Sequence, residues 1–165
     1  MNIIQTTPKP RLAAIDDIIC LTGMLGASSK AYIKKMEFLS LCKHVHIFNE
    51  LSEGIDKALK FMLEKSGVSA EIQLEDIPFG RGPMKKYGSQ PSRLYQYALH
   101  ESNDNELILT VDPKHFADVS ADYQQKTGTP LRAIGRIVNG DPQHINYIEN
   151  AFPATQLNIP WEHFC

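Results

Sequence analysis

Apolar and polar residues follow two different periods along this chain. Between residues 51 and 63 apolar side chains recur every three or four positions, which predicts an amphipathic helix. Ser52 is the expected N-cap of this helix, and Gly67 is its expected end. From 68 to 74 apolar and polar residues alternate, which predicts a strand with one buried face. The pattern therefore changes from helix to strand at Gly67.

The rest of the chain continues this exchange of strands and helices. We expect further strands at 18–22, 44–48, 106–111 and 131–138, and further helices at 28–41, from 91 onward and at 112–127. Residues 77–90 contain three glycines and two prolines, which predicts an exposed loop. The tail from 139 begins with a turn and is weakly patterned. This order predicts the α/β class, or α+β, with helices covering a layered mixed sheet.

Composition narrows the class of protein. The chain has 165 residues, of which 42% are hydrophobic and 22% charged, so we expect a single domain spanning 1–165 with a substantial core. The formal net charge of −2 gives no reason to expect a nucleic-acid partner. Cys20, Cys42 and Cys165 are widely spaced and predict no disulfide framework. Without a recognisable signal peptide or membrane-spanning run, the expected location is the cytoplasm.

A glycine-containing turn follows the first predicted strand. Gly23 and Gly26 are followed by Ser28 and Ser29, where the next helix is expected to begin. Glycines let backbone N–H groups approach a phosphate, and a helix N-terminus attracts the same charge. The turn matches neither the dinucleotide fingerprint nor the P-loop, and a tight strand-to-helix turn needs glycine for steric reasons alone. A phosphate-binding turn and a purely structural turn are both open.

Two acidic residues and two histidines are candidate ligands. Glu50 and Glu53 flank Ser52 at a predicted strand-to-helix junction, where they either coordinate a metal or phosphate or simply favour the positive end of the helix. His44 and His46 share one face of a predicted strand and are either metal ligands or structural residues. No nucleophile has a partner pattern, so the catalytic residues are unassigned.

Three further residues have both a functional and a structural interpretation. Asn103 and Asp104 either contact a substrate amine or a metal, or belong to an ordinary polar loop. Trp161 either stacks on an aromatic ligand or packs on the core.

Five segments match the motifs of one family in order and in approximate spacing. The segment IDDIICLTGMLGASS is similar to G-D-x-I-x-x-T-G-x-L-G-D-S, with Asp17, Thr22, Gly23, Leu25, Gly26 and Ser28 at matching positions. Residues 50–54 resemble D-[IL]-S-D-G, and 65–79 resemble S-G-x-G-A-x-I-x-L-x-x-[IL]-P. Residues 102–107 stand where the family has G-G-E-D-Y-E-L, and 161–164 resemble G-[WY]-D-H-F. The chain thus resembles the C-terminal domain of thiamine-monophosphate kinase, in the aminoimidazole ribonucleotide synthetase superfamily.

The resemblance implies a fold and a set of ligand-binding positions. The fold would be the C-terminal domain of the aminoimidazole ribonucleotide synthetase type. The implied positions for a phosphorylated ligand are Thr22, Gly23, Gly26, Ser28, Ser29, Asn103, Asp104 and Trp161, and those for a metal are Glu50 and Glu53. Mg²⁺ and ATP are implied only if a nucleotide-binding half complements this chain; otherwise no cofactor is expected.

The sequence departs from the family where chemistry would take place. The aspartate after the second glycine is Ala27, D-x-S-D has become Glu50-x-Ser52-Glu53, and G-G-E-D-Y has become residues 101–105. Glutamate in place of aspartate moves a carboxylate by on the order of 1.5 Å, which octahedral Mg²⁺ tolerates poorly. The aspartates that bind the metal–nucleotide complex in the family's N-terminal domain have no counterpart in this sequence. These changes favour lost or altered catalysis.

Two functions of different class follow. The first is a non-catalytic ligand-binding or interaction module, derived from a thiamine-monophosphate kinase-like protein. The alternative is the substrate half of a split ATP-dependent phosphotransferase acting on thiamine monophosphate or a related phosphorylated small molecule. Expected partners are such a molecule and either a second copy or a separate N-terminal-half protein, but no nucleic acid or membrane. Residues 79–90 and 159–164 are the expected border of an apolar interface.

Overall fold

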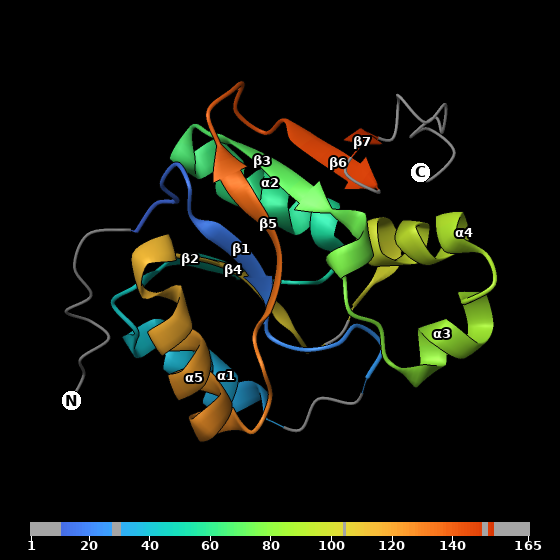
Figure 1. Cartoon of the computed structure of the whole chain (residues 1–165), viewed down its shortest axis with the longest axis horizontal. Helices are drawn as coiled ribbons and strands as arrows, with labels where there is room; N and C mark the ends of the chain where they lie inside the picture. The colour runs from blue at the N-terminus through green and yellow to red at the C-terminus, as the bar shows by residue number, and fades with distance from the viewer. Residues whose placement is uncertain (1–10, 28–30, 104, 150–151, 154–165) are drawn as a thin grey trace.

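A computed structural model describes residues 11–27, 31–103, 105–149 and 152–153 of the chain (Figure 1). Its strands are β1 (Ile18–Leu21), β2 (Val45–Glu50), β3 (Ser69–Gln73), β4 (Leu107–Val111), β5 (Arg132–Val138), β6 (Ile145–Glu149) and β7 (Phe152–Pro153). Its helices are α1 (Tyr32–Leu41), α2 (Ile55–Ser66), α3 (Arg81–Tyr87), α4 (Pro91–Gln96) and α5 (Phe116–Thr127). Short helical turns cover Leu74–Asp76, Tyr97–Glu101 and Pro113–His115.

The strands form one mixed sheet. Over the described residues its order is β2-β4-β1-β5-β3-β6-β7. Every neighbouring pair is antiparallel except β3 and β6, which run parallel. The predicted layered mixed sheet with helical cover is therefore confirmed.

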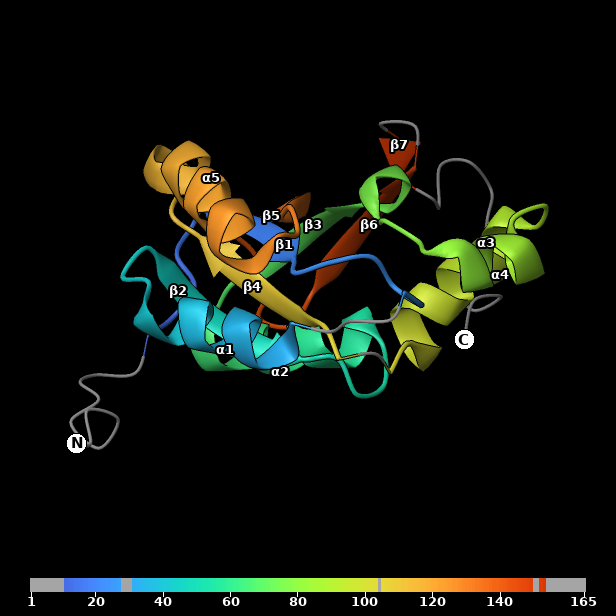
Figure 2. The same cartoon turned by 90° about the horizontal axis from the view of Figure 1, so that it is seen from below.

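Each face of the sheet has its own apolar core. Ile19 and Leu21 of β1 belong to the core beneath α2, whereas Cys20 points to the opposite face, beneath α1 and α5. This alternation follows from the two-residue period of a strand, so the central strand β1 is buried on both sides. Figures 1 and 2 show α3 and α4 at one end of the molecule, away from α1 and α5.

Two predicted helix boundaries are wrong. The helix expected from residue 28 is α1, which begins at Tyr32, and 28–30 lie outside the described residues. Ser52 does not cap α2, because the helix begins three residues later, after Gly54. Gly54 has φ +91°, and a Cβ there would lie 2.2 Å from the carbonyl oxygen of Leu99. Close contact with the turn Tyr97–Glu101 therefore determines where α2 starts.

The prediction of a loop at 77–90 is also wrong, because this segment contains helix α3. Pro83 is the third residue of α3, where a backbone N–H has no partner within the helix and proline costs little. Strands β6 and β7 were not predicted from the weakly patterned tail. Trp161 and the rest of 154–165 lie outside the described residues. Among the residues that are described, none of the helices has the length and apolar character needed to cross a membrane.

Candidate functional site

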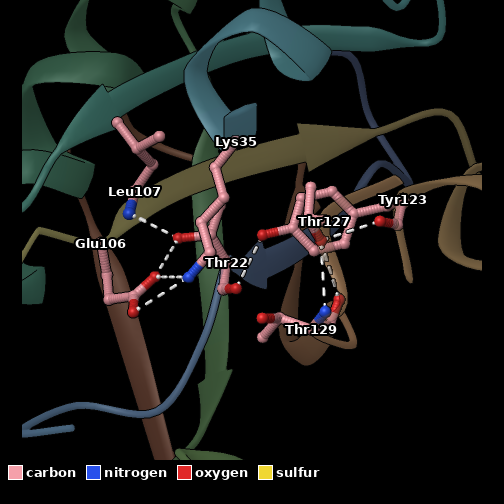
Figure 3. Close-up of polar contacts among 7 residues, drawn as sticks. All are labelled: Thr22, Lys35, Glu106, Leu107, Tyr123, Thr127 and Thr129. Atoms are coloured by element: carbon pink, nitrogen blue, oxygen red, sulfur yellow. Dashed lines mark hydrogen bonds and ion pairs between the residues drawn. The ribbon is translucent and has the colours of Figure 1, made fainter. Parts of the chain in front are cut away.

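A buried polar cluster lies where β1 ends beside the start of β4 (Figure 3). The register pairs Leu21 with Ile108, which brings Thr22 next to Leu107 and its neighbour Glu106. The Thr22 hydroxyl donates a hydrogen bond to Oε1 of Glu106 over 2.6 Å and accepts one from the Leu107 N–H over 2.8 Å. The strand pairing itself thus holds the Glu106 carboxylate in place.

Lys35 of α1 completes this cluster. Its Nζ lies 2.9 and 3.2 Å from the two carboxylate oxygens of Glu106. Lys35 and Glu106 are each only 2% exposed. Charges are removed from water at high cost unless they are paired and hydrogen-bonded. The two residues therefore form an obligatory ion pair that ties α1 to the sheet.

Tyr123 links helix α5 to the same cluster. Its hydroxyl donates to the backbone carbonyl of Thr22 over 2.8 Å. Burial raises the pKa of the Tyr123 phenol well above its ordinary value, so the phenol stays protonated and remains a donor. The cluster consequently joins β1, β4, α1 and α5 at one point.

A pocket of about 350 Å³ opens beside the ion pair. We call it the Lys35 pocket, and it is lined by Gly23, Met24, Ala27, Ala31, Lys35, Glu106, Thr127, Thr129, Pro130 and Arg132. A Cβ at Gly23 would lie 2.7 Å from Oε2 of Glu106, so only glycine lets the carboxylate lie against the backbone here. Within the described residues, nothing accepts a hydrogen bond from the N–H of Gly23 or Met24.

The charges around the Lys35 pocket favour an anion. Arg132 is exposed at the start of β5 and forms no ion pair with the described part of the chain. The charge of Lys35 is balanced by Glu106, so Arg132 leaves the pocket with a net positive charge. Together with the backbone N–H groups, this guanidinium suits a carboxylate or phosphate.

Gly26 has a packing role in the turn. Its φ is +80°, and a Cβ there would lie 2.2 Å from Cγ of Pro83. The Leu25 N–H donates to the Pro78 carbonyl over 3.0 Å, and the Gly80 N–H donates to the Leu25 carbonyl over 2.7 Å. The turn is thus fastened to the segment leading into α3, while its Gly23 end faces the pocket. Ser28 and Ser29 lie outside the described residues.

Glu50 and Glu53 have local partners on the surface. Glu50 accepts a hydrogen bond from the Tyr32 hydroxyl, and burial together with this contact raises the pKa of Tyr32 to about 12. Glu53 pairs with Lys57 one helical turn away, with 2.7 Å between Oε2 and Nζ. Neither belongs to a group of three potential metal ligands within the described residues. Their predicted role as metal ligands remains a prediction.

The other candidates are dispersed. Asn103 is exposed and does not line the Lys35 pocket, and Asp104 lies outside the described residues. His46 places Nδ1 2.6 Å from Oδ2 of the buried Asp17. His44 instead stacks on His115, with ring centroids 3.7 Å apart. The two histidines expected on one strand face thus have different partners.

The buried ion pair is what sequence reasoning missed. Glu106 occurs in the segment that resembles the family motif, but its partner Lys35 is 71 residues away. The available signal was a charged residue directly before a strand that is apolar at four of its five positions, because a buried charge must be paired.

Comparisons with known proteins relate the chain to one enzyme family. It is 30% identical over 92 residues to thiamine-monophosphate kinase from Haemophilus influenzae, covering 56% of this chain and 27% of the relative. It is 28% identical over 152 residues to that from Rhodopirellula baltica, covering 84% of this chain and 46% of the relative. The chain therefore spans less than half the length of these relatives. No family model matches it.

Solved structures show the same fold. A chain of a HypE–HypF complex superposes with a TM-score of 0.69 at 14% identity, over 86% of this chain and 52% of that chain. Thiamine-monophosphate kinase from Stenotrophomonas maltophilia superposes with a TM-score of 0.65 at 17% identity, over 88% and 54%. A thiamine-monophosphate kinase complexed with AMPPCP and TMP has a TM-score of 0.56 at 18% identity, over 87% and 50%. The chain is therefore similar in sequence to part of thiamine-monophosphate kinase, and its fold is the one that these solved structures share over about half of their length.

Proposed function

We propose that this chain is a ligand-binding module that holds a phosphorylated small molecule in the Lys35 pocket without transforming it. The observation that carries the proposal is the combination, at one pocket, of Arg132 with the N–H groups of Gly23 and Met24, which have no acceptor in the described part of the chain. Guanidinium and backbone N–H groups are strong donors to phosphate oxygens. The buried Lys35–Glu106 pair supplies a rigid wall for the ligand.

The same residues support binding more than phosphoryl transfer. Phosphoryl transfer needs metal and cationic groups that neutralise charge developing on the transferred phosphate. Here Lys35 is already neutralised by Glu106, and Glu53 is paired with Lys57. The ligand would therefore be held by Arg132 and the backbone, and Glu106, the acid that lines the described part of the pocket, is already paired with Lys35.

Binding is tested by calorimetry with inorganic phosphate and with thiamine monophosphate as probes. Arg132→Met should weaken the affinity for both by about tenfold, because a charge-assisted hydrogen bond contributes about 1.5–3 kcal/mol. Arg136→Met is the matched control, since Arg136 is exposed on the same strand but pairs with Glu71 over 3.0 Å. Equal affinities in the two variants, or no binding by the unmodified chain, would remove the pocket from consideration.

The alternative is the substrate half of a split phosphotransferase, and the name of the curated relatives favours it. A turnover assay with ATP, Mg²⁺ and thiamine monophosphate separates the two functions. The chain alone should form no thiamine diphosphate. Product formation that Glu50→Ala abolishes would instead establish the alternative and identify Glu50 as a metal ligand.

We also propose that the chain self-associates or docks on a partner protein. One solved structure of the same fold is a complex, HypE with HypF. Ile33 and Leu41 of α1 are 78% and 71% exposed, and Met84, within the expected border 79–90, is 49% exposed. Exposed apolar side chains are common at interfaces. Sedimentation over a concentration series should show association that Ile33→Glu weakens, and a monomer at every concentration would contradict self-association.

A further inference from the structure

A second group of ligand-type side chains lies at the other end of β4 from Glu106. His44 precedes β2, and Asp112 and His115 follow β4. One potential ligand atom from each of the three residues lies within 4.8 Å of the other two. The imidazoles of His44 and His115 are stacked, with centroids 3.7 Å apart and planes inclined by only 9°. All three side chains are partly exposed, so an ion has access to them.

Regular backbone structure holds these residues together. Val45 pairs with Val111 in the β2–β4 ladder, and the Asp112 N–H donates to the His44 carbonyl over 3.0 Å. The His115 N–H donates to the Asp112 carbonyl over 3.1 Å, within the turn that begins α5. The three residues are therefore positioned by a strand pair and a helical turn, which reduces the ordering that an ion would have to impose.

The donor set identifies the class of ion. Two imidazoles and one carboxylate suit a borderline transition metal such as Zn²⁺, whereas Mg²⁺ and Ca²⁺ prefer oxygen ligands. Oδ1 of Asp112 accepts the Lys114 N–H over 3.0 Å as the cap of the turn. Oδ2 contacts Nδ1 of His115 over 3.3 Å, and a metal ion would replace this contact. A tetrahedral zinc site needs ligand atoms roughly 3.3–3.5 Å apart, and the two imidazoles would have to rotate out of their stack so that both lone pairs point at one ion.

We propose that His44, Asp112 and His115 form a binding site for a divalent transition metal of the zinc class. Three protein ligands leave at least one position for water. The site would join the start of β2 to the start of the α5 region, segments 68 residues apart, and would stabilise the folded chain by mass action. It does not depend on the function proposed for the Lys35 pocket.

Among the residues that the structure describes, only these three make up the group of potential ligands. Lys43 and Lys114 flank the site, but both are exposed, and solvent screens their repulsion of a cation. His46 is next along β2, but its Nδ1 is already engaged with Asp17. Cys42 lies two residues before His44 and is not part of the group.

The test uses the full chain without a polyhistidine tag. Zn²⁺ binding is measured by calorimetry and by the shift in melting temperature, and Co²⁺ binding by its visible absorption spectrum. His44→Gln, His115→Gln and Asp112→Asn remove one ligand each, and the last keeps an oxygen to cap the turn. His144→Gln, which removes an exposed histidine elsewhere, and Cys42→Ser are matched controls.

Each ligand variant should weaken Zn²⁺ binding by at least about tenfold, since changes in the outer shell of a metal site alone cost 10–100-fold. The zinc-dependent rise in melting temperature should disappear in these variants and persist in both controls. No binding by the unmodified chain at millimolar Zn²⁺ overturns the proposal. So does an affinity that is unchanged in all three ligand variants, or one that Cys42→Ser or His144→Gln abolishes.

Discussion

Two junctions between a strand and a helix carry their charges in opposite ways. At the first, between β1 and α1, Lys35 of α1 pairs with Glu106, which directly precedes β4 and accepts a hydrogen bond from Thr22, and both charged residues are almost completely buried. At the second, between β2 and α2, the side chains of Glu53 and its partner Lys57 are 61% and 68% exposed. Segments that resemble the family motifs occur at both junctions. The acidic residues singled out from the sequence, Glu50 and Glu53, belong to the second junction.

The difference indicates that the burial of a charged residue, more than its mere presence, decides how much it contributes to the free energy of unfolding. A buried charge without its partner pays the full cost of lost hydration, whereas an exposed one simply returns to water. Gly23 increases the burial of the charge at the first junction, because it lets the Glu106 carboxylate lie against the backbone. We therefore expect substitutions at the first junction to unfold the chain far more readily than those at the second.

The largest effect is expected from Glu106→Ala. This change removes the carboxylate that pairs with the buried Lys35 ammonium, and it also removes the acceptor of the Thr22 hydroxyl. It should lower the free energy of unfolding by about 3–5 kcal/mol, as for other broken buried ion pairs. Urea denaturation of the two proteins measures the difference.

The matched control replaces both charges, as Lys35→Met with Glu106→Leu. An apolar pair of similar volume leaves no buried charge and should regain most of the lost stability. If the double variant is as unstable as Glu106→Ala, the ion pair is not the source of the effect. If Glu106→Ala costs less than about 1 kcal/mol, the contrast between the two junctions is wrong.

Substituting the glycine at either junction should cost a similar amount of stability. The two junctions would then differ in how they hold charged residues and not in how they use glycine. Gly26 and Gly54 both have positive φ, and a Cβ on either would lie 2.2 Å from another atom. Gly26→Ala and Gly54→Ala should each cost about 2–4 kcal/mol, since left-handed strain and overpacking add. Thermal and urea unfolding measure both variants.

Gly67→Ala is the control for backbone strain without crowding. Gly67 ends α2 with φ +71°, and a Cβ there would meet nothing within 4 Å. We expect a cost of about 1 kcal/mol. Equal costs for Gly26→Ala and Gly67→Ala would show that Pro83 moves aside and that the contact is not restrictive. The same comparison applies to Gly54 and the Leu99 carbonyl.

Helices and strands with a long, regular spacing of apolar residues could be predicted, because the apolar residues at those positions are the ones that become buried. Helix α2 and strand β3 match their predicted positions apart from their ends. Strand β6 was missed because most of its side chains are half-buried, which blurs the alternation. The start of α2 was misplaced because it depends on Leu99, a contact distant in sequence. Local pattern says nothing about such contacts.

The candidate site was predictable only where its residues are close in sequence. The turn containing Gly23 was found from its glycines, and the structure places Gly23 at the Lys35 pocket. Arg132 and Lys35 were not singled out, because only the sheet order brings β5 and α1 beside that turn. His44 and Asp112 likewise meet only through the β2–β4 register.

The smallest effect is expected at the second junction. Glu53→Ala removes an exposed ion pair with Lys57 and should change the free energy of unfolding by no more than about 0.5 kcal/mol. Lys57→Ala should have the same small effect, and the double variant should equal the sum of the two, because solvent screens both groups. Urea denaturation at low and high salt measures the set. A cost above about 1 kcal/mol would mean that Glu53 is buried in an assembly, since exposure in the single chain cannot produce it.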